Sequence, residues 1–344
     1  MSPTQSIATQ IAELAPASAY LQILQPLEIG KQGWQNELVL FMKPELFMVA
    51  GAEAVRHSAE MILSKLFEYQ AEVHGVALVG GQFLADQGIM DRHYGFINKM
   101  SKNASKITSA EDRAKVAALL GLVSLEGTPL LGGHEYLQKY PGDTIAQLDA
   151  LWFTKKSLKV MSGFYIQLYE AHGDRFVLVN GFHPGQLNHF TAPDHRIALF
   201  LVHSDTPWKV LRGDMVGNTY PEKAAPGSMR GAFYADPPHY GLERVDISAN
   251  GVHLSAGPFE GVFEILNFFG SLTQGQRFAV PEGGEKPLPL LAKRLVARGL
   301  SPEEALKVAS NPPVTANGKA TDLFSATEDF DTEQAIEFWL NQAK

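Results

Sequence analysis

A small set of polar residues in the second half of the chain has the types and spacing for phosphate chemistry. His253 follows the turn signal Asn250-Gly251, and a helical apolar pattern starting near Gly257-Pro258 places Glu264 on its polar face. A carboxylate that folds back onto a histidine fixes its tautomer and supports positive charge. Arg230 lies upstream in a glycine-flanked loop, where its planar guanidinium can reach an anion. The expectation is one loop system that handles phosphate, with the histidine at a turn.

The same region carries three short motifs. They are Gly217–Pro221 (GNTYP), Pro226–Phe233 (PGSMRGAF) and Asn250–Ser255 (NGVHLS). In this order they resemble the signature of the nucleoside diphosphate kinases, which reads G-x-T-x-P, PG[ST]-x-RG-x-F and N-x-x-H-x-S. In that family the histidine carries the phosphoryl group, and a glutamate follows it by eleven positions, as Glu264 follows His253 here.

The resemblance implies a reaction and a set of site residues. The terminal phosphoryl group of a nucleoside triphosphate would move to a nucleoside diphosphate through a phosphohistidine on His253, with Glu264 and Ser255 orienting the ring and the transferring group. Mg²⁺ would bridge the phosphates, and no protein metal ligand is expected. The resemblance implies that phosphate or sugar is contacted by Lys43, Arg212, Thr219, Arg230 and Asn250, that Tyr94 shapes the site, and that Phe182 stacks on the base.

Several apolar segments have the pattern of elements that would position these residues. Strands are predicted at 38–42, 73–83, 197–202 and 244–247, and helices over 53–70 and 259–269. Lys43 directly follows the first strand, at the end where a cleft would lie. The resemblance implies an α+β fold, a ferredoxin-like antiparallel sheet covered by helices.

The length of the chain predicts a core with additions. A chain of 344 residues with 45% hydrophobic content is long for one domain. The expected parts are an N-terminal arm at 1–36, a nucleoside diphosphate kinase-like core at 37–95 and 176–282, an inserted helical subdomain at 96–175, and a helical C-terminal extension at 283–344. A strand at 175–179 is expected to return the chain to the core, and another is predicted at 277–280.

Composition narrows the partners. The formal net charge of −8 argues against nucleic acid and membrane surfaces, because both reward a basic face. The absence of cysteine excludes disulfides, thiolate metal sites and cysteine nucleophiles. No apolar run approaches the roughly 20 residues of a membrane span. We therefore expect a cytoplasmic protein whose partners are nucleoside di- and triphosphates, and the sequence leaves homo-oligomer formation open.

Two other classes of function stay open. The chain could be a nucleotide-binding regulatory protein on the same fold without turnover, or an assembly protein that uses its insertion and extension for contacts. Incubation with γ-labelled ATP distinguishes the three classes, since only the kinase would carry label on His253.

Overall fold

The computed structural model describes residues 3–14, 20–48, 51–273 and 287–342. The chain divides into two compact units, the first comprising Met1–Ile89 with Ala192–Lys344 and the second Met90–Thr191. In the described residues, no helix has the length and apolar content needed to cross a membrane. The strand predicted at 277–280 lies outside the described residues.

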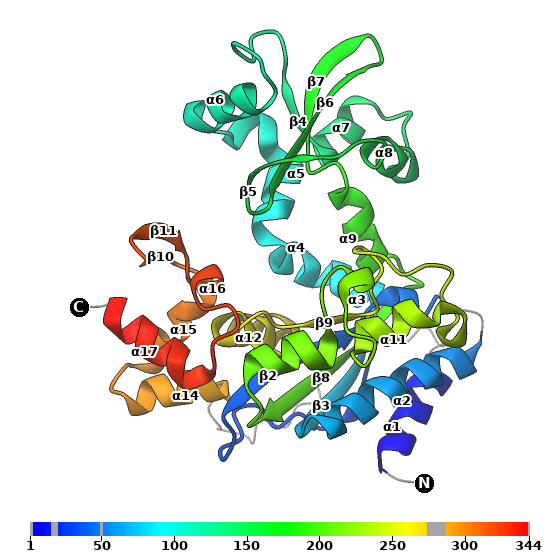
Figure 1. The fold of residues 1–344 in the computed structure, drawn as a ribbon, viewed down its shortest axis with the longest axis vertical. Coiled ribbons are helices and arrows are strands. Elements are labelled where there is room, and N and C mark those ends of the chain that lie inside the picture. Colours follow the sequence, from blue (N-terminus) through cyan, green and yellow to red (C-terminus); the bar gives the residue numbers. More distant parts are fainter. Residues whose placement is uncertain (1–2, 15–19, 49–50, 274–286, 343–344) are drawn as a thin grey trace. The chain divides into compact units, whose positions relative to one another are not determined.

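The first unit is built on an antiparallel sheet (Figure 1). Its strands stand in the order β1-β3-β8-β2-β9, namely β1 (Leu21–Gln25), β3 (Ala71–Gly80), β8 (Arg196–Ser204), β2 (Asn36–Met42) and β9 (Val252–Leu254). The succession β2, α2 (Ala52–Glu68), β3, β8, α11 (Met229–Ala235), β9 is the β-α-β-β-α-β order of a ferredoxin-like unit. The predicted α+β fold is therefore confirmed, with β1 added at one edge.

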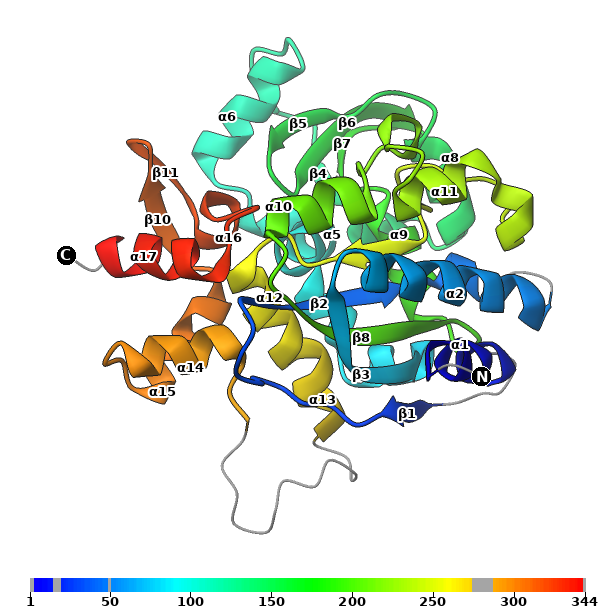
Figure 2. The same cartoon turned by 60° about the horizontal axis from the view of Figure 1, so that its bottom comes forward.

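Strand β2 lies between β8 and β9 in this sheet and is buried along its whole length. Alternate side chains point to opposite faces, so Leu38 and Leu40 join the apolar cluster formed with α2 and α1 (Pro3–Glu13). Those two helices lie side by side (Figure 2). Phe41 points to the other face, where its ring lies 5.5 Å from that of Phe268 in η5 (Ile265–Phe269). A continuous apolar run is the expected pattern for a strand covered on both faces.

The C-terminal extension packs against α12 (Pro258–Glu264). It contains α14 (Leu290–Ala297), α15 (Pro302–Leu306), α16 (Leu323–Ala326), α17 (Thr332–Gln342) and the hairpin of β10 (Pro313–Ala316) with β11 (Lys319–Asp322). The C-terminal extension was predicted to be helical, but it also contains this β-hairpin. Asn317 and Gly318, at the tip of the hairpin, both have positive φ, which is the geometry that an Asn-Gly turn favours.

The second unit contains a sheet in the order β4-β7-β6-β5. Its strands are β4 (Leu130–Gly132), β5 (Leu158–Met161), β6 (Phe164–Ala171) and β7 (Asp174–Val179). Helix α4 (Ile89–His93) begins at the last residue of the first segment of unit one and continues into the second unit. The other helices of the second unit are α5 (Gly95–Ile107), α6 (Ala110–Leu119), α7 (Gly133–Lys139), α8 (Ile145–Trp152) and α9 (His183–Thr191).

Two expectations about this region were wrong. The insertion predicted at 96–175 is not purely helical, and the compact unit spans Met90–Thr191. The segment 175–179 is a strand, yet it pairs with β4 and β6 and does not join the core sheet. The tight turn His172-Gly173, where both residues have positive φ, joins β6 to β7 as a hairpin, and this pairing keeps β7 in the sheet of the second unit.

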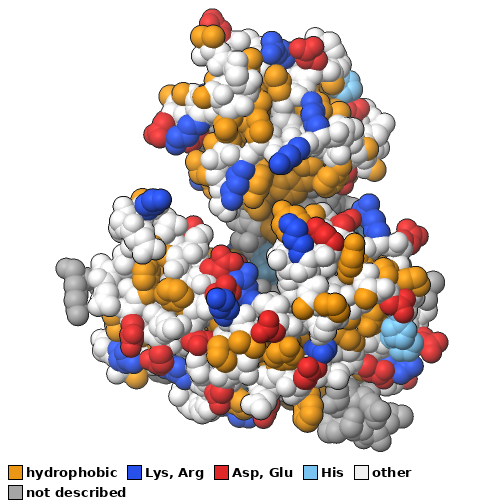
Figure 3. Space-filling model, in the orientation of Figure 1, with side chains coloured by type: hydrophobic (Ala, Val, Ile, Leu, Met, Phe, Trp, Pro, Cys, Tyr) orange, Lys and Arg blue, Asp and Glu red, His pale blue; other side chains and the backbone are white. Residues whose placement is uncertain are grey.

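On the face of the first unit that Figure 3 shows, acidic and basic side chains are interspersed.

Candidate active site

His253 lies on β9, opposite Phe41 of β2 in an antiparallel pair. Its ring stacks on that of Phe41, with ring centroids 4.5 Å apart and an angle of 18° between the planes. Gly251, two residues before His253, has φ +80°, and a Cβ there would lie 2.6 Å from the ring of Phe233, so only glycine fits. The histidine therefore occupies a strand, and the prediction that placed it at a turn was wrong.

The prediction of a strand at 244–247 was wrong, and the reason is local. Asp246 Oδ1 accepts hydrogen bonds from the backbone N–H groups of Ser248 and Ala249, at 2.8 and 3.0 Å. This aspartate turn holds the segment in a compact conformation. The pairing partner of β2 is supplied instead by β9, a few residues later.

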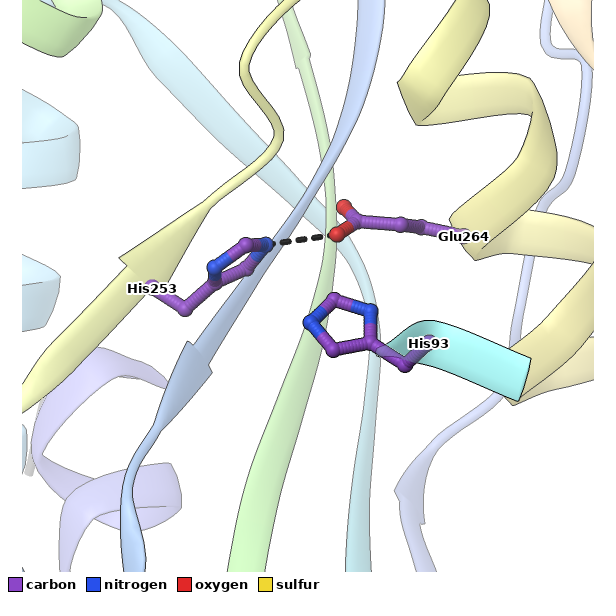
Figure 4. Close-up of side chains that lie close together, drawn as sticks. All are labelled: His93, His253 and Glu264. Carbon is purple, nitrogen blue, oxygen red and sulfur yellow. Dashed lines mark hydrogen bonds and ion pairs between the residues drawn. The ribbon is translucent and has the colours of Figure 1, made fainter. Parts of the chain in front are cut away.

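Glu264 joins His253 and Ser255 into one hydrogen-bonded group. The Nε2 of His253 lies 2.6 Å from Glu264 Oε1 (Figure 4), and Ser255 Oγ donates to Glu264 Oε2 at 2.5 Å. Helix α12 brings the carboxylate back to the strand, since Gly257 and Pro258 start the helix directly after Ser255 and Ala256. Glu264 is fully buried. The three residues predicted to be catalytic are thus in contact.

The protonation state of His253 follows from its surroundings. Its pKa is lowered to about 3, mainly by burial and also by the cations Lys43, Arg230 and Arg212, while Glu260 opposes the shift. The ring is therefore neutral near pH 7 and carries one N–H. A carboxylate accepts hydrogen bonds, so that N–H is on Nε2, which faces Glu264, and the lone pair is on Nδ1.

Lys43 is held beside the strand of the histidine. Its backbone N–H donates to Gly251 O at 2.8 Å, and its Nζ donates to Asn250 Oδ1 at 2.6 Å. Burial lowers the pKa of Lys43, and Arg230 adds to this shift, whereas Glu45 opposes it. Glu45 also accepts a hydrogen bond from Gly251 N at 2.8 Å. The lysine, the asparagine and the glycine turn thus form one connected group.

Asn250 is almost completely buried, and both ends of its amide are used. Its Oδ1 accepts from Lys43, and its Nδ2 donates to the backbone oxygens of Thr219 and Ile247, at 3.3 and 3.2 Å. The side chain of Asn250 therefore positions Lys43 and ties the Thr219 loop to the site. Thr219 itself is exposed.

Arg230 lies in helix α11, capped by Ser228, and not in a loop as predicted. Its Nη1 donates to Gly217 O at 2.8 Å and its Nη2 to Val252 O at 3.0 Å. Its Nε is buried without a hydrogen-bond partner in the part of the chain that the structure describes. Burial, with a smaller contribution from Arg212, lowers the pKa of Arg230 to about 10. Even so, Arg230 is a cation at neutral pH.

Arg212 belongs to η2 (Leu211–Val216) and is paired with the C-terminal extension. Its Nη1 lies 2.5 Å from Asp329 Oδ1 and its Nη2 lies 2.8 Å from Glu328 Oε1. Burial alone would lower the pKa of Arg212, but Asp329 and Glu328 outweigh it and raise the pKa. The two acidic partners were not predicted.

Glu260 is a further member of the site that the sequence analysis missed. Its Oε2 accepts a hydrogen bond from Ala256 N at 2.6 Å. Burial raises its pKa to about 7, with Glu264 adding to the shift and His253 opposing it. Glu260 stands four residues before Glu264 on one helix, a spacing that places both side chains on the same face. That spacing is visible in the sequence and could have identified it.

The structure thus places eight of the ten predicted residues in the first unit: Lys43, Arg212, Thr219, Arg230, Asn250, His253, Ser255 and Glu264. Tyr94 and Phe182 belong to the second unit. The ring of Tyr94 lies 5.7 Å from that of His183, and the ring of Phe182 lies 5.7 Å from that of Trp152. Their contacts with a nucleotide stay predictions.

Comparison with known proteins gives a distant structural likeness. No protein-family model matches the sequence, and no curated protein sequence is significantly similar to it. Among solved structures, an NDP kinase from Pyrobaculum aerophilum aligns with 68% of this chain and 95% of its own, at 15% sequence identity and a TM-score of 0.33.

Proposed function

We propose that this protein is a nucleoside diphosphate kinase-like phosphotransferase that moves the terminal phosphoryl group of an NTP to an NDP through a phosphohistidine at His253. The observation that carries the proposal is the hydrogen bond from His253 Nε2 to the buried carboxylate of Glu264. It keeps the proton on one ring nitrogen and the lone pair on the other, which a nucleophilic histidine requires.

In the proposed reaction Nδ1 of His253 attacks the γ-phosphorus of the NTP. The N–P bond forms while the bond to the β-phosphate oxygen breaks, and the NDP leaves with that electron pair. The proton on Nε2 stays between the ring and Glu264 throughout, so the carboxylate offsets the positive charge that the ring gains. A second NDP then takes the phosphoryl group by the reverse of the same step.

The cations near His253 support this chemistry. Arg230 donates to the carbonyl of Val252, the residue before His253, and Lys43 donates to Asn250, three residues before it. Together with Arg212, these cations also lower the pKa of the histidine. Positive groups fixed in a partly buried site stabilise the charge that spreads over the phosphoryl oxygens. In this proposal Mg²⁺ arrives with the nucleotide, because Mg²⁺ keeps several waters and needs few protein ligands when phosphates bind it.

Labelling tests the proposal. Incubation with γ-labelled ATP should give an acid-labile, base-stable label on the unmodified protein and none on His253→Ala. His239→Ala is the matched control, because His239 stacks on His57 at the surface and has no part in the proposed step. Nucleotide binding without label would favour the regulatory protein without turnover. Absence of nucleotide binding would favour the assembly protein.

A further inference from the structure

The pairing of Arg212 with the C-terminal extension stands out among the cations near His253. Arg230 pairs with backbone oxygens and, within the described chain, with no carboxylate. Arg212, in contrast, carries two carboxylates on its two terminal nitrogens, Asp329 at 2.5 Å and Glu328 at 2.8 Å. One positive charge therefore meets two negative charges, and this corner of the site has a net charge of −1.

The acidic pair is held in place from both sides. Asp329 donates its backbone N–H to Ala256 O at 3.0 Å, on the segment that joins β9 to α12. Two residues later, Asp331 Oδ1 accepts from the backbone N–H of Trp208 at 2.7 Å. Thr332 N donates to Asn36 Oδ1 at 3.0 Å, which fixes the start of α17 to β2. The carboxylates are therefore a built part of the first unit.

The acidic pair occupies the cation that the proposed function assigns to substrate phosphate. Arg212 is one of the three cations that act on His253, and Asp329 bonds to Ala256, three residues after that histidine. Carboxylates and phosphates present similar oxygens to a guanidinium and bind it in similar geometry. A phosphate that reaches Arg212 must displace these oxygens or be repelled by them.

We infer that Glu328 and Asp329 compete with substrate phosphate for Arg212 and so determine how tightly the site binds phosphate chains. This inference rests on the proposed function, since it takes Arg212 as part of the phosphate site. A role limited to orienting Arg212 makes the opposite prediction. Removing the carboxylates would then loosen the arginine and weaken phosphate binding, whereas competition predicts stronger binding.

The size of the effect follows from the exposure of the pair. The side chains of Glu328 and Asp329 are 51% and 40% exposed, so solvent screens both ion pairs. Removing two partly exposed ion pairs of this kind changes a dissociation constant by about 3- to 30-fold in total. The double variant should therefore bind a phosphate chain about 3- to 30-fold more tightly than the unmodified protein.

The test uses inorganic tripolyphosphate, which probes phosphate binding without chemistry on a nucleotide. Its dissociation constant is measured by calorimetry at fixed ionic strength for the unmodified protein and for Glu328→Gln/Asp329→Asn. Asparagine suits position 329 because the residue there has φ +63°, which asparagine tolerates. The matched control is Glu303→Gln/Glu337→Gln, which removes two negative charges from exposed positions of the same extension. Thermal melting checks that each variant is folded, and Glu328→Gln alone replaces the double variant if the latter does not fold.

Competition predicts tighter binding by the double variant and an unchanged constant for the control. Equal or weaker binding by the double variant overturns the inference, as does an equal gain in the control or a failure of every protein to bind tripolyphosphate. Labelling of His253 in the same preparations reports on the proposed function separately. If His253 is labelled but the double variant binds tripolyphosphate no more tightly than the unmodified protein, only the competition by Glu328 and Asp329 is refuted. If the double variant binds more tightly but no protein is labelled, only the kinase proposal is refuted.

Discussion

Replacing Glu264 by glutamine should slow phosphorylation of His253 with little change in shape. The carboxylate accepts from His253 Nε2 at 2.6 Å and from Ser255 Oγ at 2.5 Å, and both are donors. An amide can accept from only one of them through its oxygen. If the amide nitrogen faces the ring, Nε2 must accept, the ring proton moves to Nδ1, and the nucleophilic lone pair is lost.

The magnitude follows from two effects. If the amide oxygen faces the ring instead, the bond loses its charge assistance and falls from about 1.5–3 to about 0.5–1.5 kcal/mol. A unit charge about 4 Å from another contributes about 4 kcal/mol at an effective dielectric constant of about 20, so about half a charge developing on the ring contributes about 2 kcal/mol. Together they raise the barrier by about 3 kcal/mol, which slows the step about 100-fold.

The assay is single-turnover labelling of the protein by γ-labelled ATP, quenched at increasing times. Glu264→Gln should label about 100-fold more slowly than the unmodified protein, and Glu337→Gln, an exposed residue of α17, should label at the unmodified rate. A Glu264→Gln rate within about twofold of the unmodified rate would show that the carboxylate does not govern the reactivity of His253, contrary to the reasoning above.

Three further predictions concern stability, measured by urea unfolding. Burial raises the pKa of Glu260 to about 7 from the ordinary 4.5, so protonated Glu260 contributes its full stabilisation below pH 4.5 and this contribution is lost as pH rises through 7. The free energy of unfolding of Glu260→Gln, relative to that of the unmodified protein, should therefore rise by about 3 kcal/mol from pH 4.5 to pH 8. A difference between the two proteins that does not change with pH would contradict this. Arg230→Met leaves the carbonyls of Gly217 and Val252 without their donor and should cost about 2–4 kcal/mol, whereas the exposed control Arg244→Met should change stability by less than about 0.5 kcal/mol. Gly251→Ala, with φ +80° and Phe233 in the way, should cost at least about 2 kcal/mol, and Gly142→Ala, where the space is open, should cost far less.

The sequence identified the elements whose patterns are local and strong. The segments 38–42 and 197–202 are continuous apolar runs, and each lies within a buried strand of the observed sheet. The strand predicted at 73–83 forms as β3 over Ala71–Gly80, but residues 81–83 begin the helix α3 (Gly81–Asp86). The helix predicted at 259–269 also forms, because Pro258 starts it and apolar residues recur at helical spacing. The helix that follows His253 predicted that Glu264 folds back towards the histidine, but the strand β9 that carries His253 was not predicted.

Other features depend on contacts that no local pattern encodes. β9 has three residues, too few for a periodic signal, and its partner β2 lies more than 200 positions earlier. The pair of Arg212 with Asp329 joins residues 117 positions apart, and the sequence around either residue shows no sign of the other. Strand β6 lies in the segment 96–175 that was predicted to be helical, and its residues alternate only partly between buried and exposed positions.

Phosphoryl transfer from the labelled protein to a second nucleotide tests the central claim most directly. The protein is labelled with γ-labelled ATP, separated from free nucleotide, and mixed with unlabelled GDP. If His253 is a phosphoryl carrier, the label leaves the protein and appears as γ-labelled GTP, and protein carrying His253→Ala yields none. Label that stays on the protein in the presence of GDP, or GTP formed equally by the His253→Ala variant, would contradict the account.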